Sequence, residues 1–299
     1  MARKCWLARG TVAVATVLLS AMAGAAEIRA VWEQSGKGLY PGDWPRTFRV
    51  LKAYGVTDIF VNVGGVDFAH YSSKILPQSY LFRTSGDQLK ACLAASRGTG
   101  VRVHAWLFCF NATRATAAQR AAFEKKKWYL KDPGGKALTY LDPSNPDLRW
   151  TLLKVIEEIA RAYPVDGVHV DFVRWYERVD VAQATPAVVA RFRAETKNPA
   201  VHEGAFLQWR AAKVASFVSL ARARVKAARP SAWFTVAVLG KYPSCIDAVG
   251  QDWKAWLRKG LADYIVPMNY TADASKYASF VAVQAQTKAR RRRRYPESG

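Results

Sequence analysis

The segment DGVHVDFVRW, residues 166–175, combines the apolar alternation of a buried strand with two ionisable side chains. Strand geometry predicts two faces, one formed by Val168, Val170 and Phe172 and the other by His169, Asp171 and Val173. An ionisable side chain on a buried strand costs free energy unless it is paired or has a function. We therefore expect a strand over residues 166–173 that carries Asp171 near its carboxyl end.

Apolar runs on both sides of this segment alternate with helical patterns. They predict further strands at residues 28–33, 57–63, 101–110, 233–239 and 264–268. Helices are predicted at residues 43–54, 87–97, 205–228 and 251–259, and two more begin at Asn145 and Thr185. Residues 111–141 show neither pattern, so we expect a long irregular loop there.

The helix that begins after Asn145 has the clearest start in the chain. Asn145 is a preferred capping residue, Pro146 suits the first helical position, and Asp147 complements the helix dipole. Apolar side chains then recur at helical spacing, namely Leu148, Leu152, Val155, Ile156 and Ile159. This spacing predicts one buried stripe along the helix.

Strands that alternate with helices predict a parallel sheet covered by helices. No G-x-G-x-x-G motif follows the first strand, which argues against a dinucleotide-binding fold. Polar and aromatic residues gather instead where the strands end, as in a (β/α)8 TIM-type barrel: Asn62, Trp106, Asp171 and Asn269. The predicted strands number six and a closed barrel has eight, so we expect a barrel that is incomplete at its C-terminus.

The two ends of the chain differ in composition from this predicted barrel domain, residues 27–285. Residues 1–26 have a basic start, a short apolar run and a small-residue cleavage site, which predict a secretory signal peptide. The alternative is an uncleaved anchor; after cleavage no stable membrane anchor would remain. Residues 286–299 contain an arginine run and no apolar periodicity, which indicates a disordered basic tail or a frameshifted end.

The formal net charge of +22 predicts nonspecific attraction to anionic polymers. No helix-turn-helix, zinc-finger or RNA-binding sheet motif accompanies it, so no specific nucleic-acid partner is expected. Three cysteines follow the predicted signal peptide, too few for a disulfide framework although one pair can form. No C-x-x-C motif or histidine cluster is present, so we expect no metal and no cofactor. Composition leaves the oligomeric state open.

Asp171 is the predicted catalytic residue, because barrel enzymes place such carboxylates at the carboxyl ends of strands. Arg174 follows closely and either forms a structural ion pair with Asp171 or binds substrate. His169 and His104 lie on predicted strands, and each is either a satisfied core histidine or a hydrogen-bond partner of a carboxylate or of a sugar hydroxyl.

Two blocks of sequence resemble the glycosyl-hydrolase-like 10 family of bacterial envelope proteins. YLDPSNPDLR at residues 140–149 and YPVDGVHVDFVR at residues 163–174 are similar to the family pattern LDPxNPxxR…YxVDGIHxDxxRY. The opening IRAVW and the region from Asp252 to Tyr270 resemble further blocks of the family. Trp175 departs from the aromatic-Pro that usually follows the arginine, and the family's last strands are missing. The resemblance implies a (β/α)8 barrel related to polysaccharide hydrolases, with Asp171 as the catalytic carboxylate.

Hydrolysis of a glycosidic bond usually requires a second carboxylate. We rank Glu33, which closes the first strand, and Asp247, which follows the fifth, slightly ahead of Glu177 and Asp273. The alternative is that all four are ordinary loop carboxylates. Sugar binding by stacking and hydrogen bonds is expected from Trp106, Asn269 and Tyr270, with packing as the alternative role of the two aromatic residues.

These observations predict an exported, periplasmic or secreted glycosidase. Its expected substrate and partner is an envelope polysaccharide such as the glycan strands of peptidoglycan. Two other interpretations remain open: a barrel that binds polysaccharide without cleaving it, and an inactive truncated fragment.

Overall fold

The computed structural model describes residues 27–132, 134–177 and 184–287. The predicted signal peptide and residues 288–299 of the predicted tail lie outside the described residues. Of the three predicted segments, the described residues therefore include most of the barrel domain and residues 286–287 of the tail.

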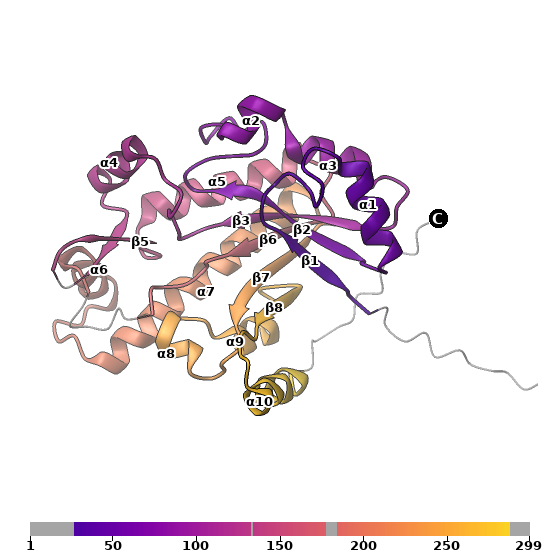
Figure 1. The fold of residues 1–299 in the computed structure, drawn as a ribbon. Helices are drawn as coiled ribbons and strands as arrows, with labels where there is room; N and C mark the ends of the chain where they lie inside the picture. The colour runs from indigo at the N-terminus through magenta and orange to yellow at the C-terminus, as the bar shows by residue number, and fades with distance from the viewer. Residues whose placement is uncertain (1–26, 133, 178–183, 288–299) are drawn as a thin grey trace, which may run out of the picture. The chain divides into compact units, whose positions relative to one another are not determined.

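The main sheet has six parallel strands in the order β1-β2-β3-β6-β7-β8, as predicted from the apolar runs. Its strands are β1 (Ala30–Glu33), β2 (Asp58–Gly65), β3 (Arg102–Phe108), β6 (Gly167–Asp171), β7 (Trp233–Leu239) and β8 (Tyr264–Met268). They curl into a half-barrel with helices around it (Figure 1). Within the described residues the sheet does not close, because β1 pairs only with β2 and β8 pairs only with β7. The prediction of an incomplete (β/α) barrel is confirmed.

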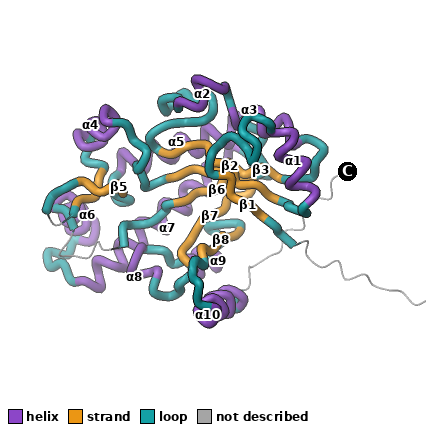
Figure 2. The backbone as a smooth tube through the Cα atoms, in the orientation of Figure 1, coloured by secondary structure: helices purple, strands orange, loops and turns teal. Residues whose placement is uncertain are grey.

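The helices alternate with these strands along the chain (Figure 2). They are α1 (Trp44–Ala53), α2 (Tyr80–Ser85), α3 (Gln88–Ser96), α4 (Ala117–Lys125), α5 (Pro146–Ala162), α6 (Pro186–Thr196), α7 (Glu203–Ala228), α8 (Cys245–Val249), α9 (Trp253–Arg258) and α10 (Ala274–Ala285). Several start where a predicted cap lies: the side chains of Asp43, Asn145 and Thr185 accept hydrogen bonds from backbone N–H groups of the first turn.

The predicted apolar stripe on α5 is buried throughout. Its five members are all 0% exposed, namely Leu148, Leu152, Val155, Ile156 and Ile159. They belong to one continuous hydrophobic core that also includes strand residues such as Val168 and Val170 and α7 residues such as Val214 and Phe217. Helices α5 and α7 thus cover the face of the sheet that carries Val168 and Val170, and the carboxyl ends of the strands are left to carry polar side chains.

The prediction of an irregular loop over residues 111–141 is wrong. This segment contains α4 and a two-stranded antiparallel sheet of β4 (Tyr129–Lys131) and β5 (Ala137–Leu141). Helix α4 begins with a capping box, in which the Thr116 and Gln119 side chains each bond to the other residue's backbone N–H. The helix is short and buries a single residue, Phe123, so it lacks the long apolar stripe by which helices are recognised in sequence.

The predicted strand over residues 166–173 ends earlier than expected. Strand β6 stops at Asp171, because Phe172 has a φ of +52° and the strand alternation breaks there. As a result Phe172 lies beside Asp171 in the cleft described below, whereas Val173 is 0% exposed in the core. The prediction that Phe172 faces away from Asp171 is therefore wrong.

Candidate functional site

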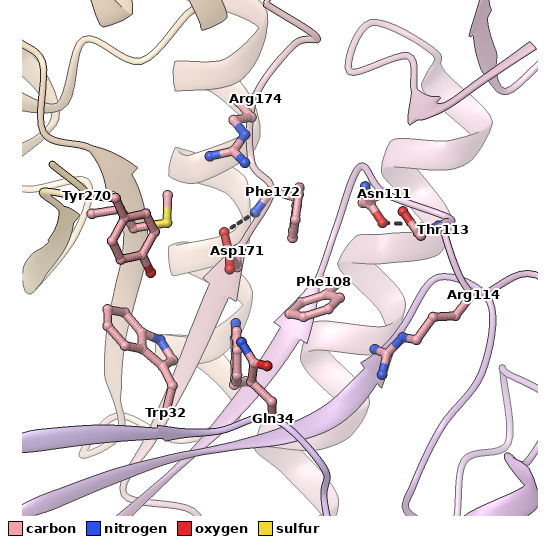
Figure 3. A pocket seen from close by; sticks show the side chains of 12 residues that line it. Trp32, Gln34, Phe108, Asn111, Thr113, Arg114, Asp171, Phe172, Arg174 and Tyr270 are labelled. Carbon is pink, nitrogen blue, oxygen red and sulfur yellow. Dashed lines mark hydrogen bonds between the residues drawn. The ribbon is translucent and has the colours of Figure 1, made fainter. Parts of the chain in front are cut away.

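A cleft of about 500 Å³ lies at the carboxyl ends of β1, β3, β6 and β8, where barrel folds carry their sites (Figure 3). It is lined by Trp32, Gln34, Trp106, Phe108, Asn111, Thr113, Arg114, Asp171, Phe172, Arg174, Met268 and Tyr270. The lining combines aromatic rings, amide side chains and two guanidinium groups with a single carboxylate among the described residues. Four of the predicted site residues come together here: Asp171, Trp106, Arg174 and Tyr270.

Asp171 ends β6 and is only 6% exposed. Burial raises the pKa of its carboxyl group, which favours the protonated form. Three neighbours oppose this effect: the charge of Arg174, the Phe172 backbone N–H, which donates a 2.5 Å hydrogen bond to Oδ1, and the Trp106 indole. The Trp106 Nε1 lacks a partner with full hydrogen-bond geometry among the described residues, so its contribution is the weakest contact of the three. A carboxyl group in this position can retain a proton and release it to a ligand.

Arg174 lies on the loop after β6 and reaches into the same cleft (Figure 3). Its guanidinium carbon lies 4.7 Å from the centre of the Phe172 ring. Its buried Nη1 has no hydrogen-bond partner among the described residues. Arg174 therefore acts on Asp171 through its charge and keeps donor capacity for a ligand.

His169 lies beneath the cleft and does not line it. Its Nε2 accepts a 3.2 Å hydrogen bond from the Trp32 indole N–H, so Nδ1 carries the proton and donates to Thr235 Oγ1 at 2.8 Å. Burial lowers the pKa of His169 well below its usual range, which keeps the imidazole neutral. His169 thus orients the cleft residue Trp32 as a satisfied core histidine, one of the two roles expected from the sequence.

His104 lies deeper still, near the amino end of β3. Its Nε2 lies 2.8 Å from Oδ1 of Asp58 at the start of β2, and Arg102 donates two further hydrogen bonds to the same carboxylate. His104 is 0% exposed, and the cleft lining does not include it. The structure places His104 in a buried network at the opposite end of the strands from the cleft.

Glu33 and Asp247 do not join Asp171 in the cleft. Trp32 faces the cleft and Glu33, the next residue of β1, points to the other side of the strand. The Glu33 carboxylate accepts hydrogen bonds from the backbone N–H groups of Ser35, at 3.0 Å, and Gly36, at 2.8 Å. Asp247 is exposed on α8. Glu33 holds a loop, and Asp247 does not line the cleft that contains Asp171.

Asn269 and Tyr270 follow β8 but diverge. The amide of Asn269 exchanges two hydrogen bonds with Gln284 of α10, at 3.1 and 2.8 Å. Tyr270 is 77% exposed and lines the cleft. Asn269 therefore anchors α10 to the sheet, whereas Tyr270 presents its ring to a ligand.

Sequence reasoning missed most of the cleft wall. The residues not predicted are Trp32, Gln34, Phe108, Asn111, Thr113, Arg114, Phe172 and Met268. Trp32, Gln34, Phe108 and Met268 lie at or next to the carboxyl ends of strands, a position that could have indicated them. Asn111, Thr113 and Arg114 belong to the segment that was expected to be irregular.

In the part of the chain that the structure describes, no group of three histidine, cysteine, aspartate or glutamate residues could hold a metal ion. No described helix combines the length and the apolar character needed to span a membrane. The three described cysteines, Cys92, Cys109 and Cys245, are buried and free.

Two curated relatives are similar in sequence to this chain over most of its length. Glycosyl hydrolase DigH of Escherichia coli K12 is 23% identical over 256 residues, covering 74% of this chain and 56% of DigH. Glycosyl hydrolase YngK of Bacillus subtilis is 23% identical over 309 aligned positions, covering 87% of this chain and 57% of YngK. The chain thus spans a little over half the length of these curated relatives.

Solved structures with a similar fold include two glycosidases. The β-amylase catalytic domain of Paenibacillus polymyxa matches with a TM-score of 0.56 at 11% identity, over 86% of this chain and 83% of that domain. The β-galactosidase of Marinomonas ef1 matches with a TM-score of 0.57 at 13% identity, over 82% of this chain and 41% of the enzyme. At these identities the likeness concerns the fold alone.

A family model matches most of the chain. The model is described as glycosyl hydrolase-like 10, and it matches residues 27–295, a range that includes the β6 segment with Asp171 and the end of β8 with Tyr270. The chain therefore belongs to the glycosyl hydrolase-like 10 family.

Proposed function

We propose that this protein is an exported glycosidase that cleaves an envelope polysaccharide, with Asp171 as its general acid. The observation that carries the proposal is the environment of Asp171. It is a buried carboxyl group of raised pKa in an open cleft, on a fold shared with glycosidases. A general acid works best when its pKa is raised toward the working pH, because it must hold a proton that it can give away.

The cleft wall supports a sugar ligand. Rings on two sides of Asp171 offer flat apolar surfaces, which suit the C–H faces of a pyranose. They belong to Trp32, Trp106, Phe108, Phe172 and Tyr270. The amides of Gln34 and Asn111 and the guanidinium of Arg174 offer hydrogen bonds for the hydroxyl groups at the ring edge.

One carboxylate is fewer than most glycosidases use. A sugar that carries a 2-acetamido group can supply the missing nucleophile itself, as in substrate-assisted glycosidases. Asp171 would protonate the glycosidic oxygen as the C1–O bond breaks, and the acetamido oxygen would bond to C1. Water would then attack C1, displace the acetamido oxygen and return a proton to Asp171. The amino sugars of peptidoglycan glycan strands carry this group.

The test uses denuded glycan strands and the variant Asp171→Asn. We expect loss of a general acid to lower the rate of cleavage by about a hundredfold to ten-thousandfold, read as soluble fragments by mass spectrometry. Asp247→Asn is the matched control, because Asp247 is an exposed carboxylate outside the cleft and should keep full activity. Unchanged cleavage by Asp171→Asn would refute the role of Asp171.

A second substrate separates the two ways of supplying a nucleophile. De-N-acetylated strands lack the acetamido oxygen, so the wild type should bind them and leave them intact. Equal cleavage of acetylated and deacetylated strands would show that the acetamido oxygen is not the nucleophile, and that a protein carboxylate either attacks C1 or activates the attacking water.

The presence of one carboxylate in the described lining also favours a second candidate function, a barrel that binds polysaccharide without cleaving it. This candidate predicts that wild type and Asp171→Asn both bind glycan strands and that neither releases fragments. Release of fragments by the wild type excludes it.

The proposal of export is supported by the basic start, short apolar run and small residues of positions 1–26. N-terminal sequencing of the protein from a periplasmic fraction should begin near residue 27. Recovery of the uncleaved chain from the membrane fraction would instead indicate an anchor.

A further inference from the structure

A second cavity of about 470 Å³ adjoins the cleft beyond the loop that follows β3. Residues that form its wall include Phe68, Gln78, Tyr80, Arg83 and Gln119. It has no part in the chemistry proposed for Asp171. It is lined by rings and polar side chains, as the cleft is.

Arg114 joins the two cavities, since it lines both of them. Its guanidinium carbon lies 4.7 Å from the centre of the Phe68 ring, in the second cavity, and 4.9 Å from that of Phe108, in the cleft. The side chain is exposed, and one of its N–H groups donates a 3.3 Å hydrogen bond to Asn62. A guanidinium has five N–H donors, so Arg114 keeps donors for a ligand that crosses from one cavity to the other.

The floor of the second cavity is fixed by buried contacts. His70 is 7% exposed, and its Nδ1 lies 2.7 Å from Oγ of Ser79, which in turn caps α2 by accepting a hydrogen bond from the Phe82 backbone N–H. Burial lowers the pKa of His70 to about 4, so the ring is neutral at neutral pH. These contacts fix the start of α2, and with it the position of Tyr80.

An exposed tyrosine stands at each end of this path. Tyr80 is 76% exposed on the second cavity, and Tyr270 is 77% exposed on the cleft. Each of these two rings presents a flat surface on which a sugar ring can stack. A path for a ligand therefore runs from Tyr270 through the cleft with Asp171 to Arg114. From Arg114 it continues through the second cavity to Tyr80.

We propose that the second cavity is a further sugar-binding subsite, which holds units of the same glycan chain that extend past the bond positioned at Asp171. Tyr80 stacks on a sugar ring there, and Arg114 binds the unit that connects the two cavities. Because the chain continues on both sides of the reacting bond, cleavage occurs within strands and not only at their ends. This inference rests on the proposed function.

The test measures binding apart from chemistry. The variant Asp171→Asn serves as a non-cleaving background. Trp32 and Trp106 line the cleft, so quenching of tryptophan fluorescence reports that a ligand occupies it. The probes are a disaccharide, a tetrasaccharide and long denuded strands of peptidoglycan. Affinity should rise with length, and Tyr80→Ala should lower the affinity for long strands about tenfold while leaving that for the disaccharide unchanged.

Tyr54→Ala is the matched control, because Tyr54 is 79% exposed after α1 and lines neither cavity. In the active enzyme, Tyr80→Ala should also shift the products of long strands toward release from chain ends. Binding that is independent of length, or equal in Tyr80→Ala and Tyr54→Ala, would overturn the subsite and leave the proposed function intact. Failure of every probe to bind would overturn the proposed function, and the subsite with it.

Discussion

Replacement of Asp58 by asparagine should destabilise the fold by about 2 kcal/mol at neutral pH. Burial alone would raise the pKa of Asp58, but hydrogen bonds from His104, Arg102 and Thr57 outweigh it and lower the pKa from 3.8 to about 2. Each pKa unit corresponds to about 1.4 kcal/mol of preference for the charged form. Asp58 is 1% exposed, so solvent screening does not reduce this contribution.

The pH dependence follows from the direction of this shift. The folded protein holds the Asp58 proton more weakly than the unfolded chain does, so the carboxylate stabilises the fold above the unfolded pKa of 3.8. This stabilisation is lost as the pH falls toward the folded value of about 2. The free-energy difference between wild type and Asp58→Asn should therefore shrink to about half its neutral value near pH 3.

Urea unfolding followed by tryptophan fluorescence at both pH values measures this difference. Asp43→Asn is the matched control, because Asp43 caps α1 and asparagine caps a helix equally well. A loss of stability that is the same at both pH values, or no loss at all, would refute the argument from the Asp58 network. A loss of similar size in Asp43→Asn would show that the effect is not specific to the buried carboxylate.

Four further variants test individual residues. His104→Gln should be less stable than wild type because Asp58 loses a hydrogen-bond partner, yet it should keep its activity on glycan strands. Loss of activity without loss of stability would instead indicate that His104 contributes to the site. Burial raises the pKa of Asp171, so the charged carboxylate costs stability and Asp171→Asn should melt at a higher temperature than wild type at about pH 8. This gain should vanish near pH 3, where the side chain at position 171 is neutral in wild type and variant. Equal melting temperatures at about pH 8 would contradict this prediction. The charge of Arg174 lowers the pKa of Asp171, so Arg174→Met should move the alkaline limb of the kcat/KM profile to higher pH. Trp106→Phe, which keeps a ring and removes the indole N–H, should move the same limb less; an unmoved limb in both variants would exclude Asp171 as the titrating acid.

Local sequence was sufficient for the six strands of the main sheet, for helices such as α1, α5 and α7, and for the class of fold. The predicted bounds of β7 and β8 coincide with those observed, and the caps at Asn145 and Thr185 start the helices expected of them. These features depend on neighbouring residues: side-chain period, capping groups and backbone restriction act within a few positions of each other. The same local pattern placed Asp171 near the carboxyl end of a strand, although that strand ends two residues earlier than predicted.

The partners of each site residue were decided by the tertiary structure. His104 and Asp58 are 46 positions apart, and the register of β2 and β3 brings them together below the cleft. Trp32 and Tyr270, near opposite ends of the chain, line one cleft because the half-barrel curls β1 and β8 toward it. Phe172 lines the cleft because its φ is positive, and strand alternation does not predict such a backbone conformation. Such contacts depend on strand register, sheet curvature and loop conformation, which arise only when distant segments pack. The sequence therefore placed Asp171 near the end of a strand, and the tertiary structure determined which residues surround it.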